Sequence, residues 1–334
     1  MNNEITKLAP VILEEIKKAK KILLHLHPGP DGDSVGSSLA MMHVLKGMGK
    51  DVVLIKGDSL LPQYLSVLPG FSEIVQKNFF EIDLSEFDLF LIQDSSTVKF
   101  VSQLNEVVFP ETLKTIVIDH HASNLGFAGI NLLAPTYPAV CQILFELFKE
   151  WGVSISEDTA KCLFLGMYTD TGGFTYSNTL SSTFKIAGEL SSIAPDLHKI
   201  IFEMNNSNTK GQIVYEGLAL NSVKTFLNDR VAIATVSHDD LQNNNISPEE
   251  SSAGIANKLK SVIGWDIGVS IVESIPGQVK VSFRTRDSEK YDLTKVAGML
   301  GGGGHKAAAG AVVSLPLKDA IGKVVTTLGE AYKF

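Results

Sequence analysis

Short apolar runs alternate with longer segments of helical periodicity through the first part of the chain. The strand-like runs are "KILLHLH" (residues 21–27), "DVVLIK" (51–56), "DLFLIQD" (88–94) and "TIVIDHH" (115–121). Helical patterns occupy residues 34–49, 139–152, 157–170 and 181–194. Strands that alternate with helices of this length pair in parallel through right-handed crossovers. The pattern therefore predicts an α/β fold with a doubly wound, mostly parallel sheet.

The pattern changes after residue 205. The stretch "EMNNSNTKG" (203–211) is polar and rich in turn formers, which is typical of a domain boundary. Beyond it, strand-like runs cover residues 229–237, 266–274 and 278–286, and helical patterns cover 292–300 and 317–332. We therefore predict a first domain of residues 1–205, a linker of residues 206–211 and a smaller α/β domain of residues 212–334.

Composition narrows the classes of function. Hydrophobic residues make up 44% of the 334 residues and charged residues 20%, as in globular proteins with apolar cores. The formal net charge of -8 argues against a basic face that grips long nucleic acid, but it allows a small anionic substrate at a local site. The sequence shows no signal peptide and no apolar run near the ~20 residues that span a bilayer. Cys141 and Cys162 lie in apolar, helical surroundings, which predicts reduced thiols and a cytoplasmic protein.

Side chains of the kind that bind metals gather where the predicted strands of the first domain end. In chain order they are His27, Asp31, Asp33, Asp94, Asp119, His120, His121 and, at the end of a helical pattern, Asp170. Ligands of a doubly wound sheet bind outside the carboxyl ends of its strands, so we expect these side chains to meet there. The two glycines that follow Asp170 would let the backbone pass close to the same place.

This convergence points to bound cations. Five carboxylates with no cationic side chain among them would repel one another and raise one another's pKa. Imidazole together with carboxylate suits a borderline or hard divalent metal, and two such ions about 3.5 to 4 Å apart clamp a phosphoryl displacement. Asp94 is placed to bridge them. Taken singly, Asp94 fits a helix cap, the Asp31–Asp33 segment fits a turn, and two adjacent histidines fit a packed pair, but jointly they favour an active site.

Five motifs stand in an order that resembles a known family. The stretches "HPGPDGD" (27–33), "DHH" (119–121) and "YTDTGGF" (168–174), with the strand-end Asp94, follow the order and approximate spacing of the four motifs of the DHH phosphoesterase family. The later "GGGGHKAAAG" (301–310) resembles the DHH-associated C-terminal domain. The resemblance covers nearly the whole chain.

The resemblance implies a set of ligands for two manganese-type ions, with Mg²⁺ or Co²⁺ as alternatives. The first ion would be held by His27, Asp31 and Asp94. The second would be held by Asp33, Asp94, His120 and Asp170. His121 would face the substrate, where it binds the reacting phosphate or handles a proton at the leaving oxygen, and Asp119 would orient an imidazole.

The glycine-rich segment predicts a second binding element. Gly301 to Gly304 fit either an anion-binding nest or a helix C-cap with a turn. Arg284 and Arg286 alternate along a predicted strand, so we expect them on one side, with Arg284 the better anchored. The resemblance implies that this domain holds a terminal nucleotide or phosphate across a cleft from the metals. The implied contacts are Arg284, Arg286, Gly302, Gly303, Gly304 and His305.

The compact, two-domain organisation resembles the oligoribonuclease (nanoRNase) and pAp phosphatase branch of this family. That implies hydrolysis of short RNA or DNA oligonucleotides or of 3'-phosphoadenosine 5'-phosphate (pAp), with no long nucleic acid or membrane as partner and with a homodimer left open. A single-strand-specific exonuclease of the family would usually carry further nucleic-acid-binding domains. A non-catalytic nucleotide-binding regulator would more naturally have lost a ligand, and none is lost. A dinucleotide-dependent oxidoreductase would need a glycine fingerprint where this chain has "PGPDGDS".

Overall fold

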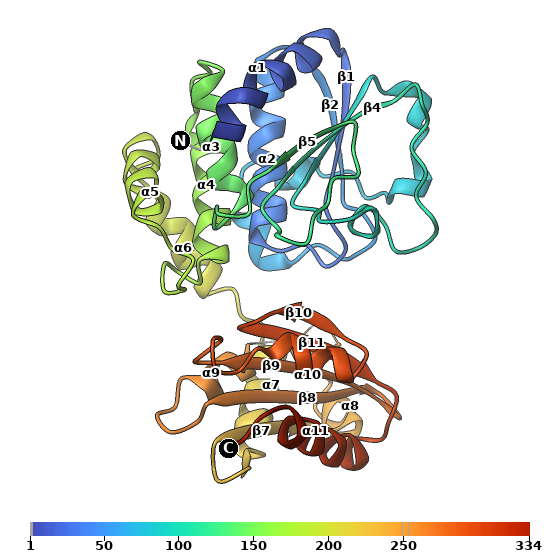
Figure 1. The fold of residues 1–334 in the computed structure, drawn as a ribbon, viewed down its shortest axis with the longest axis vertical. Coiled ribbons are helices and arrows are strands. Elements are labelled where there is room, and N and C mark those ends of the chain that lie inside the picture. The colour runs from blue at the N-terminus through green and yellow to red at the C-terminus, as the bar shows by residue number, and fades with distance from the viewer. Residues whose placement is uncertain (1–2, 249, 253) are drawn as a thin grey trace. The chain divides into compact units, whose positions relative to one another are not determined.

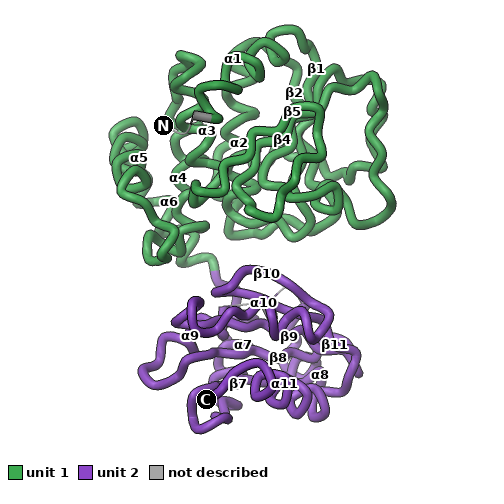
Figure 2. The backbone as a smooth tube through the Cα atoms, viewed as in Figure 1, with its two compact units in different colours: residues 1–207 green, residues 208–334 purple. Residues whose placement is uncertain are grey.

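The computed structural model describes residues 3–248, 250–252 and 254–334. The chain divides into two compact units, residues 1–207 and residues 208–334 (Figure 2). A short non-helical segment lies between helix α6 (Leu197–Asn205) and helix α7 (Lys210–Asn221), so α7 begins inside the segment that the sequence predicts as a linker. Each unit has its own apolar core.

The first unit is built on a sheet of five parallel strands in the order β2-β1-β3-β4-β5 (Figure 1). The strands are β1 (Lys21–His25), β2 (Asp51–Ile55), β3 (Leu89–Gln93), β4 (Lys114–Asp119) and β5 (Ile130–Leu133). The first four are predicted by their apolar runs, and the parallel sheet is confirmed. In this strand order the direction of winding reverses between β1 and β3, which is where such sheets bind ligands.

The two faces of this sheet are covered differently. One face packs against helices α1 (Asn3–Lys18), α2 (Gly32–Gly47), α3 (Val140–Glu150), α4 (Glu157–Asp170), α5 (Ser181–Ile193) and α6. The other face, which includes Phe90 and Val117, is covered by residues from the segment 79–113. Apart from strand β3, the regular structure of that segment is limited to the short 3-10 helices Phe79–Glu81, Leu84–Glu86 and Val98–Phe100. Their single turns leave no period of 3.6 residues to detect in the sequence.

The second unit is a mixed sheet of six strands in the order β10-β11-β9-β8-β7-β6. The strands are β6 (Lys224–Phe226), β7 (Val231–Val236), β8 (Ile267–Ile275), β9 (Gln278–Thr285), β10 (Gly303–His305) and β11 (Ala308–Val313). Helices α7, α8 (His238–Asn243) and α9 (Ile255–Lys260) contribute to one core, and α10 (Leu293–Met299) and α11 (Leu317–Ala331) contribute to the other. A 3-10 turn, Glu250–Ser252, precedes α9.

The glycine run serves two local structures. Gly301 follows α10 with φ +79°, and the Gly302 amide donates to the Ala297 carbonyl at 2.7 Å, so these two glycines end the helix. Gly303 and Gly304 then form strand β10, which pairs with β11. A Cβ on Gly302 would lie 2.0 Å from the Gly310 carbonyl oxygen, so a larger residue cannot occupy this position without a backbone shift. The cap-and-turn interpretation therefore accounts for the first half of the run, and a hairpin accounts for the second.

In the part of the chain that the structure describes, we find no helix with both the length and the apolar character needed to cross a membrane.

Candidate active site

The reactive side chains of the first unit converge at the carboxyl edge of its parallel sheet. His27, Asp31 and Asp33 lie in the connection from β1 to α2 and in its first turn. Asp94 follows β3, and Asp119 ends β4 with His120 and His121 directly after it. Asp170 is the last residue of α4, a helix that packs closely against α2. The edge of the sheet where the strand order reverses is therefore lined by carboxylates and imidazoles.

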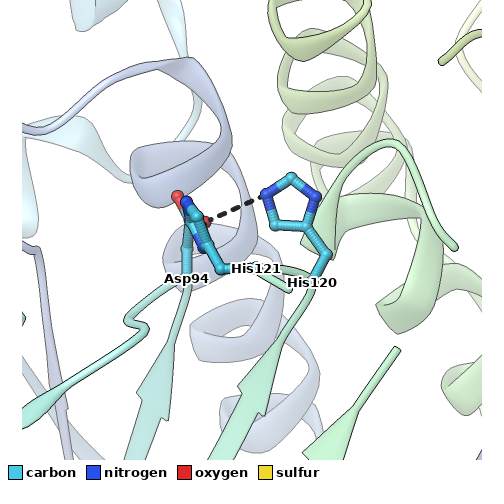
Figure 3. A group of neighbouring side chains, drawn as sticks. All are labelled: Asp94, His120 and His121. Carbon is cyan, nitrogen blue, oxygen red and sulfur yellow. Dashed lines mark ion pairs between the residues drawn. The ribbon is translucent and has the colours of Figure 1, made fainter. Parts of the chain in front are cut away.

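Asp94 lies at the centre of this cluster. Its Oδ2 is 3.3 Å from His27 Nε2, and its Oδ1 is 3.5 Å from His120 Nε2 and 3.6 Å from His121 Nδ1 (Figure 3). The side chain is only 2% exposed, and Oδ1 accepts no hydrogen bond from the described residues. The backbone has φ +51°, a conformation uncommon outside glycine that is often found at functional sites. The next helical turn has Thr97 as its N-cap, so the interpretation of Asp94 as a helix cap is wrong.

His27 and His120 both present Nε2 to the cluster. His27 Nδ1 lies 3.1 Å from the Pro28 carbonyl oxygen, and His120 Nδ1 lies 3.2 Å from that of Tyr137. A carbonyl can only accept, so each neutral ring carries its proton on Nδ1 and keeps a lone pair on Nε2. Metal-binding histidines are commonly oriented in this way by a partner of the other nitrogen. His120 therefore does more than pack against its neighbour His121.

Asp33 and Asp31 combine local structural roles with positions in the cluster. Asp33 is fully buried, and its oxygens accept from the Val140 amide at 2.6 Å and the Cys141 amide at 2.9 Å, at the N-terminus of α3. Asp31 caps α2 by accepting from the Asp33 and Ser34 amides at 3.0 Å each. The same Asp31 Oδ1 is 3.8 Å from His27 Nε2, so the turn interpretation and the cluster interpretation both hold here.

Three groups of side chains bring potential ligand atoms within 4.8 Å of one another. They are His27 with Asp31 and Asp94, Asp33 with His120 and Asp170, and Asp94 with His120 and His121. The first group has the same members as the set predicted for the first ion. The second has three of the four residues predicted for the second ion, and His120 links it to Asp94. Asp94 is therefore positioned between two sites of mixed imidazole and carboxylate character.

The electrostatics of the cluster call for added positive charge. Within the described residues, the charged partners of these carboxylates are all histidines. Burial lowers the pKa of His27, but Asp31 and Asp94 outweigh it and raise the pKa to about 11. Burial and the charge of Asp94 raise the pKa of Asp33 to about 7, and burial with the charge of Asp33 raises that of Asp170. Clustered carboxylates with imidazoles as their charged partners fit divalent cations.

Asp119 is not a member of the three ligand groups, and it holds His121, which is. Its Oδ1 lies 2.8 Å from His121 Nδ1, and its Oδ2 accepts from Asn124 Nδ2 at 2.8 Å. Asn124 is buried and also donates to the Ser95 carbonyl at 3.1 Å. No motif in the sequence points to Asn124. Its position three residues after the "DHH" run is a signal only once the loop is known to fold back onto Asp119.

The two arginines of the second unit have different surroundings. Arg284 lies on β9, opposite Gly268 of β8 and Ala308 of β11, and Ala308 in turn pairs with His305. Residues directly opposite in antiparallel strands share a face, so Arg284 and His305 lie in one cross-strand row. Arg286 lies beyond the end of β9, and its guanidinium donates to the Val262 carbonyl at 2.9 Å. The Arg286 amide still donates to the Asp266 carbonyl at 3.1 Å, so the pairing of β9 continues by one residue at Arg286. That the two arginines lie on one side stays a prediction.

Two family models match the chain. A DHH family N-terminal domain matches residues 21–167, and a DHHA1 domain matches residues 228–333. The chain belongs to the DHH phosphoesterase family. Its members in this branch hydrolyse phosphoester bonds, and the chain is accordingly a hydrolase of that class.

Similar proteins cover almost the full length of the chain. The "Bifunctional oligoribonuclease and PAP phosphatase NrnA" of Thermus thermophilus is 28% identical over 325 residues, which cover 96% of this chain and 93% of the relative. The protein of the same name from Bacillus subtilis is 23% identical over 90% of this chain and 92% of the relative. A crystal structure of an exopolyphosphatase-related protein from Bacteroides fragilis has a TM-score of 0.89 at 24% identity, over 97% of this chain and 96% of that one, and shows the same fold.

Proposed function

We propose that the protein is a metal-dependent phosphoesterase that hydrolyses short oligonucleotides, pAp or both, releasing mononucleotide and phosphate. The relatives named as oligoribonucleases and PAP phosphatases support this choice of substrates. The observation that carries the proposal is Asp94, whose buried and unsatisfied Oδ1 lies where two ligand groups meet. A cytoplasmic location is part of the proposal, since Cys141 and Cys162 are free and buried.

The residues present fit two divalent cations, for which we propose Mn²⁺. His27, Asp31 and Asp94 would hold one, and the other would be held by Asp33, Asp94, His120 and Asp170. Bound there, the pair would supply an ionised water near neutral pH and would neutralise charge on the phosphoryl oxygens. His27 and His120 offer Nε2 to the cluster.

His121 is proposed to act on the substrate directly. Asp119 holds the Nδ1 of this imidazole and so fixes its orientation, and the ring would bind a phosphate oxygen or handle the proton that the leaving oxygen needs. Asn124 in turn fixes Asp119. His121 would touch the substrate, Asp119 would hold His121, and Asn124 would hold Asp119 from the loop behind it.

The second unit is proposed to bind a phosphate or nucleotide of the substrate. Arg284 lines a small hollow of about 50 Å³ together with Lys280 and Ser282 from the same face of β9. Burial and the charge of Arg284 lower the pKa of Lys260 nearby, as expected where cations gather. The row from Arg284 to His305 and the adjacent, exposed Gly302, Gly303 and Gly304 complete the proposed contacts. Arg286 is a weaker candidate because it contacts the end of α9.

The proposed function is tested by a panel of substrates with Mn²⁺ and then with Mg²⁺. The panel contains pAp, RNA dinucleotides to pentanucleotides, a short DNA and a long single-stranded RNA. We expect turnover of pAp, of the short RNAs or of both, and little turnover of the long RNA. Efficient degradation of the long RNA would favour the exonuclease alternative. Binding without turnover under both metals would favour the regulator.

Truncation of Arg284 is expected to weaken substrate binding. The Arg284→Ala variant should raise KM by about 10- to 100-fold and change kcat less, because a charge-assisted contact to phosphate is lost away from the reacting atoms. Steady-state kinetics on the substrate that the wild type prefers gives both constants. Arg286→Ala is the matched control and should change KM less than about threefold. Equal effects of the two substitutions would contradict the separation of their roles.

A further inference from the structure

A hollow of about 470 Å³ lies in the first unit beside the candidate metal cluster. It is lined by two loops, residues 96–99 after β3 and residues 123–127 after β4. The first loop begins two residues beyond Asp94, and the second begins two residues beyond His121. Asn124, which fixes Asp119, forms part of the wall. The hollow is therefore continuous with the loop that orients His121.

The lining is apolar with one cation. Val98, Leu125 and Phe127 contribute the large apolar side chains, and Leu125 is 95% exposed. Lys99 is exposed on the same wall, and none of the described residues that line the hollow is acidic. A single exposed leucine is ordinary on a protein surface. A concave, mostly apolar surface that adjoins reactive groups is typical of a ligand subsite.

We propose that this hollow binds the nucleoside that carries the leaving oxygen, an inference that rests on the proposed function. In either hydrolysis the water oxygen bonds to phosphorus, the bond from phosphorus to a nucleoside oxygen breaks, and that oxygen takes up a proton to become a hydroxyl. A leaving oxygen beside His121 places its nucleoside over the adjoining 123–127 loop. The base then packs on Leu125 and Val98, with Lys99 on the same wall.

One subsite of this kind would serve both classes of substrate. The phosphorus of an oligonucleotide carries a second nucleoside and that of the pAp monoester does not. In both, the bond that breaks joins phosphorus to a nucleoside oxygen. An apolar wall selects for the flat base without hydrogen bonds that would depend on its identity. We therefore expect the hollow to favour substrates that have a base and to discriminate weakly among the bases.

The test compares substrates with and without the base. The pairs are pAp with ribose 3,5-bisphosphate, and an RNA dinucleotide with its counterpart whose leaving nucleoside is abasic. We expect wild-type kcat/KM to fall when the base is removed. In Leu125→Ala that preference for the base should shrink by about tenfold, with turnover of the abasic substrates nearly unchanged. Leu125 is almost fully exposed, so its truncation should leave folding intact, as circular dichroism would check.

Two further variants complete the experiment. Ser123→Trp fills the hollow and should reduce turnover of the substrates with a base much more than that of the abasic ones. Leu220→Ala, a truncation of an exposed leucine on α7 of the second unit, should leave the preference as in the wild type. An unchanged preference in both Leu125→Ala and Ser123→Trp, in a wild type that is active, overturns the subsite alone. A wild type inactive on both substrates that have a base overturns the proposed function and the subsite with it.

Discussion

The Asp94→Asn variant is expected to lose at least about a thousandfold in kcat on pAp and on short RNA. Asp94 lies close to both His27 and His120, so its charge contributes to both proposed ion sites at once. Asparagine keeps the size of the side chain and tolerates the positive φ at this position. The substitution therefore removes a charge from the centre of the cluster without forcing a change in the backbone.

The measurement is a single-turnover and a steady-state assay with saturating Mn²⁺, beside a thermal melt that checks the fold. Asp88→Asn is the matched control, because Asp88 immediately precedes the same strand and accepts from the Lys20 and Lys21 amides at the opposite edge of the sheet. It should keep nearly full activity. Activity of Asp94→Asn within tenfold of the wild type would rule out the bridging role, and with it the two-ion arrangement.

The convergence of the cluster could be predicted because it follows from backbone direction alone. Parallel strands place their carboxyl ends at one edge, so ligand-type residues after 21–25, 89–93 and 114–118 had to approach one another once those runs were strands. Which nitrogen each histidine presents could not be predicted. That depends on the Pro28 and Tyr137 carbonyls, and Tyr137 reaches His120 only through the path of the loop between β5 and α3.

The parts that escaped prediction depend on tertiary contacts or on elements too short to show a period. Asn124 acts through a loop that folds back onto Asp119, and a lone asparagine in a loop carries no such information. Strand β9 ends at Thr285, and the Arg286 guanidinium donates to the Val262 carbonyl, a contact about which the period-two pattern of the strand carries no information. Four consecutive glycines allowed a nest or a cap equally well, and pairing with β11 decided for a hairpin.

Removal of divalent metal is expected to abolish activity and to lower the thermal stability of the protein together. Among the described residues the carboxylates of the cluster have histidines as their charged partners, and Asp33 and Asp94 are buried, so the apo protein must keep like charges close or hold protons in their place. An ion that binds the folded state at a hundredfold excess over its Kd adds about 2.7 kcal/mol per site. For a unit of this size, that predicts a rise in Tm of roughly 5 to 10 °C for each site that Mn²⁺ fills.

The experiment is dialysis against a chelator, followed by titration with Mn²⁺ and, separately, with Mg²⁺, with Tm and turnover measured on the same samples. Asp94→Asn should show a much smaller rise in Tm, since it loses a ligand of both sites. Because stabilisation grows as the logarithm of 1 + [Mn²⁺]/Kd, Tm should begin to rise in the concentration range that restores turnover and should keep rising after turnover has saturated. Full activity after chelation would exclude a metal-dependent reaction. If Mn²⁺ restored turnover of the wild type but changed the Tm of neither the wild type nor Asp94→Asn, the proposed sites would be contradicted. The ions would then act elsewhere than between the ligands at the ends of β1, β3, β4 and α4.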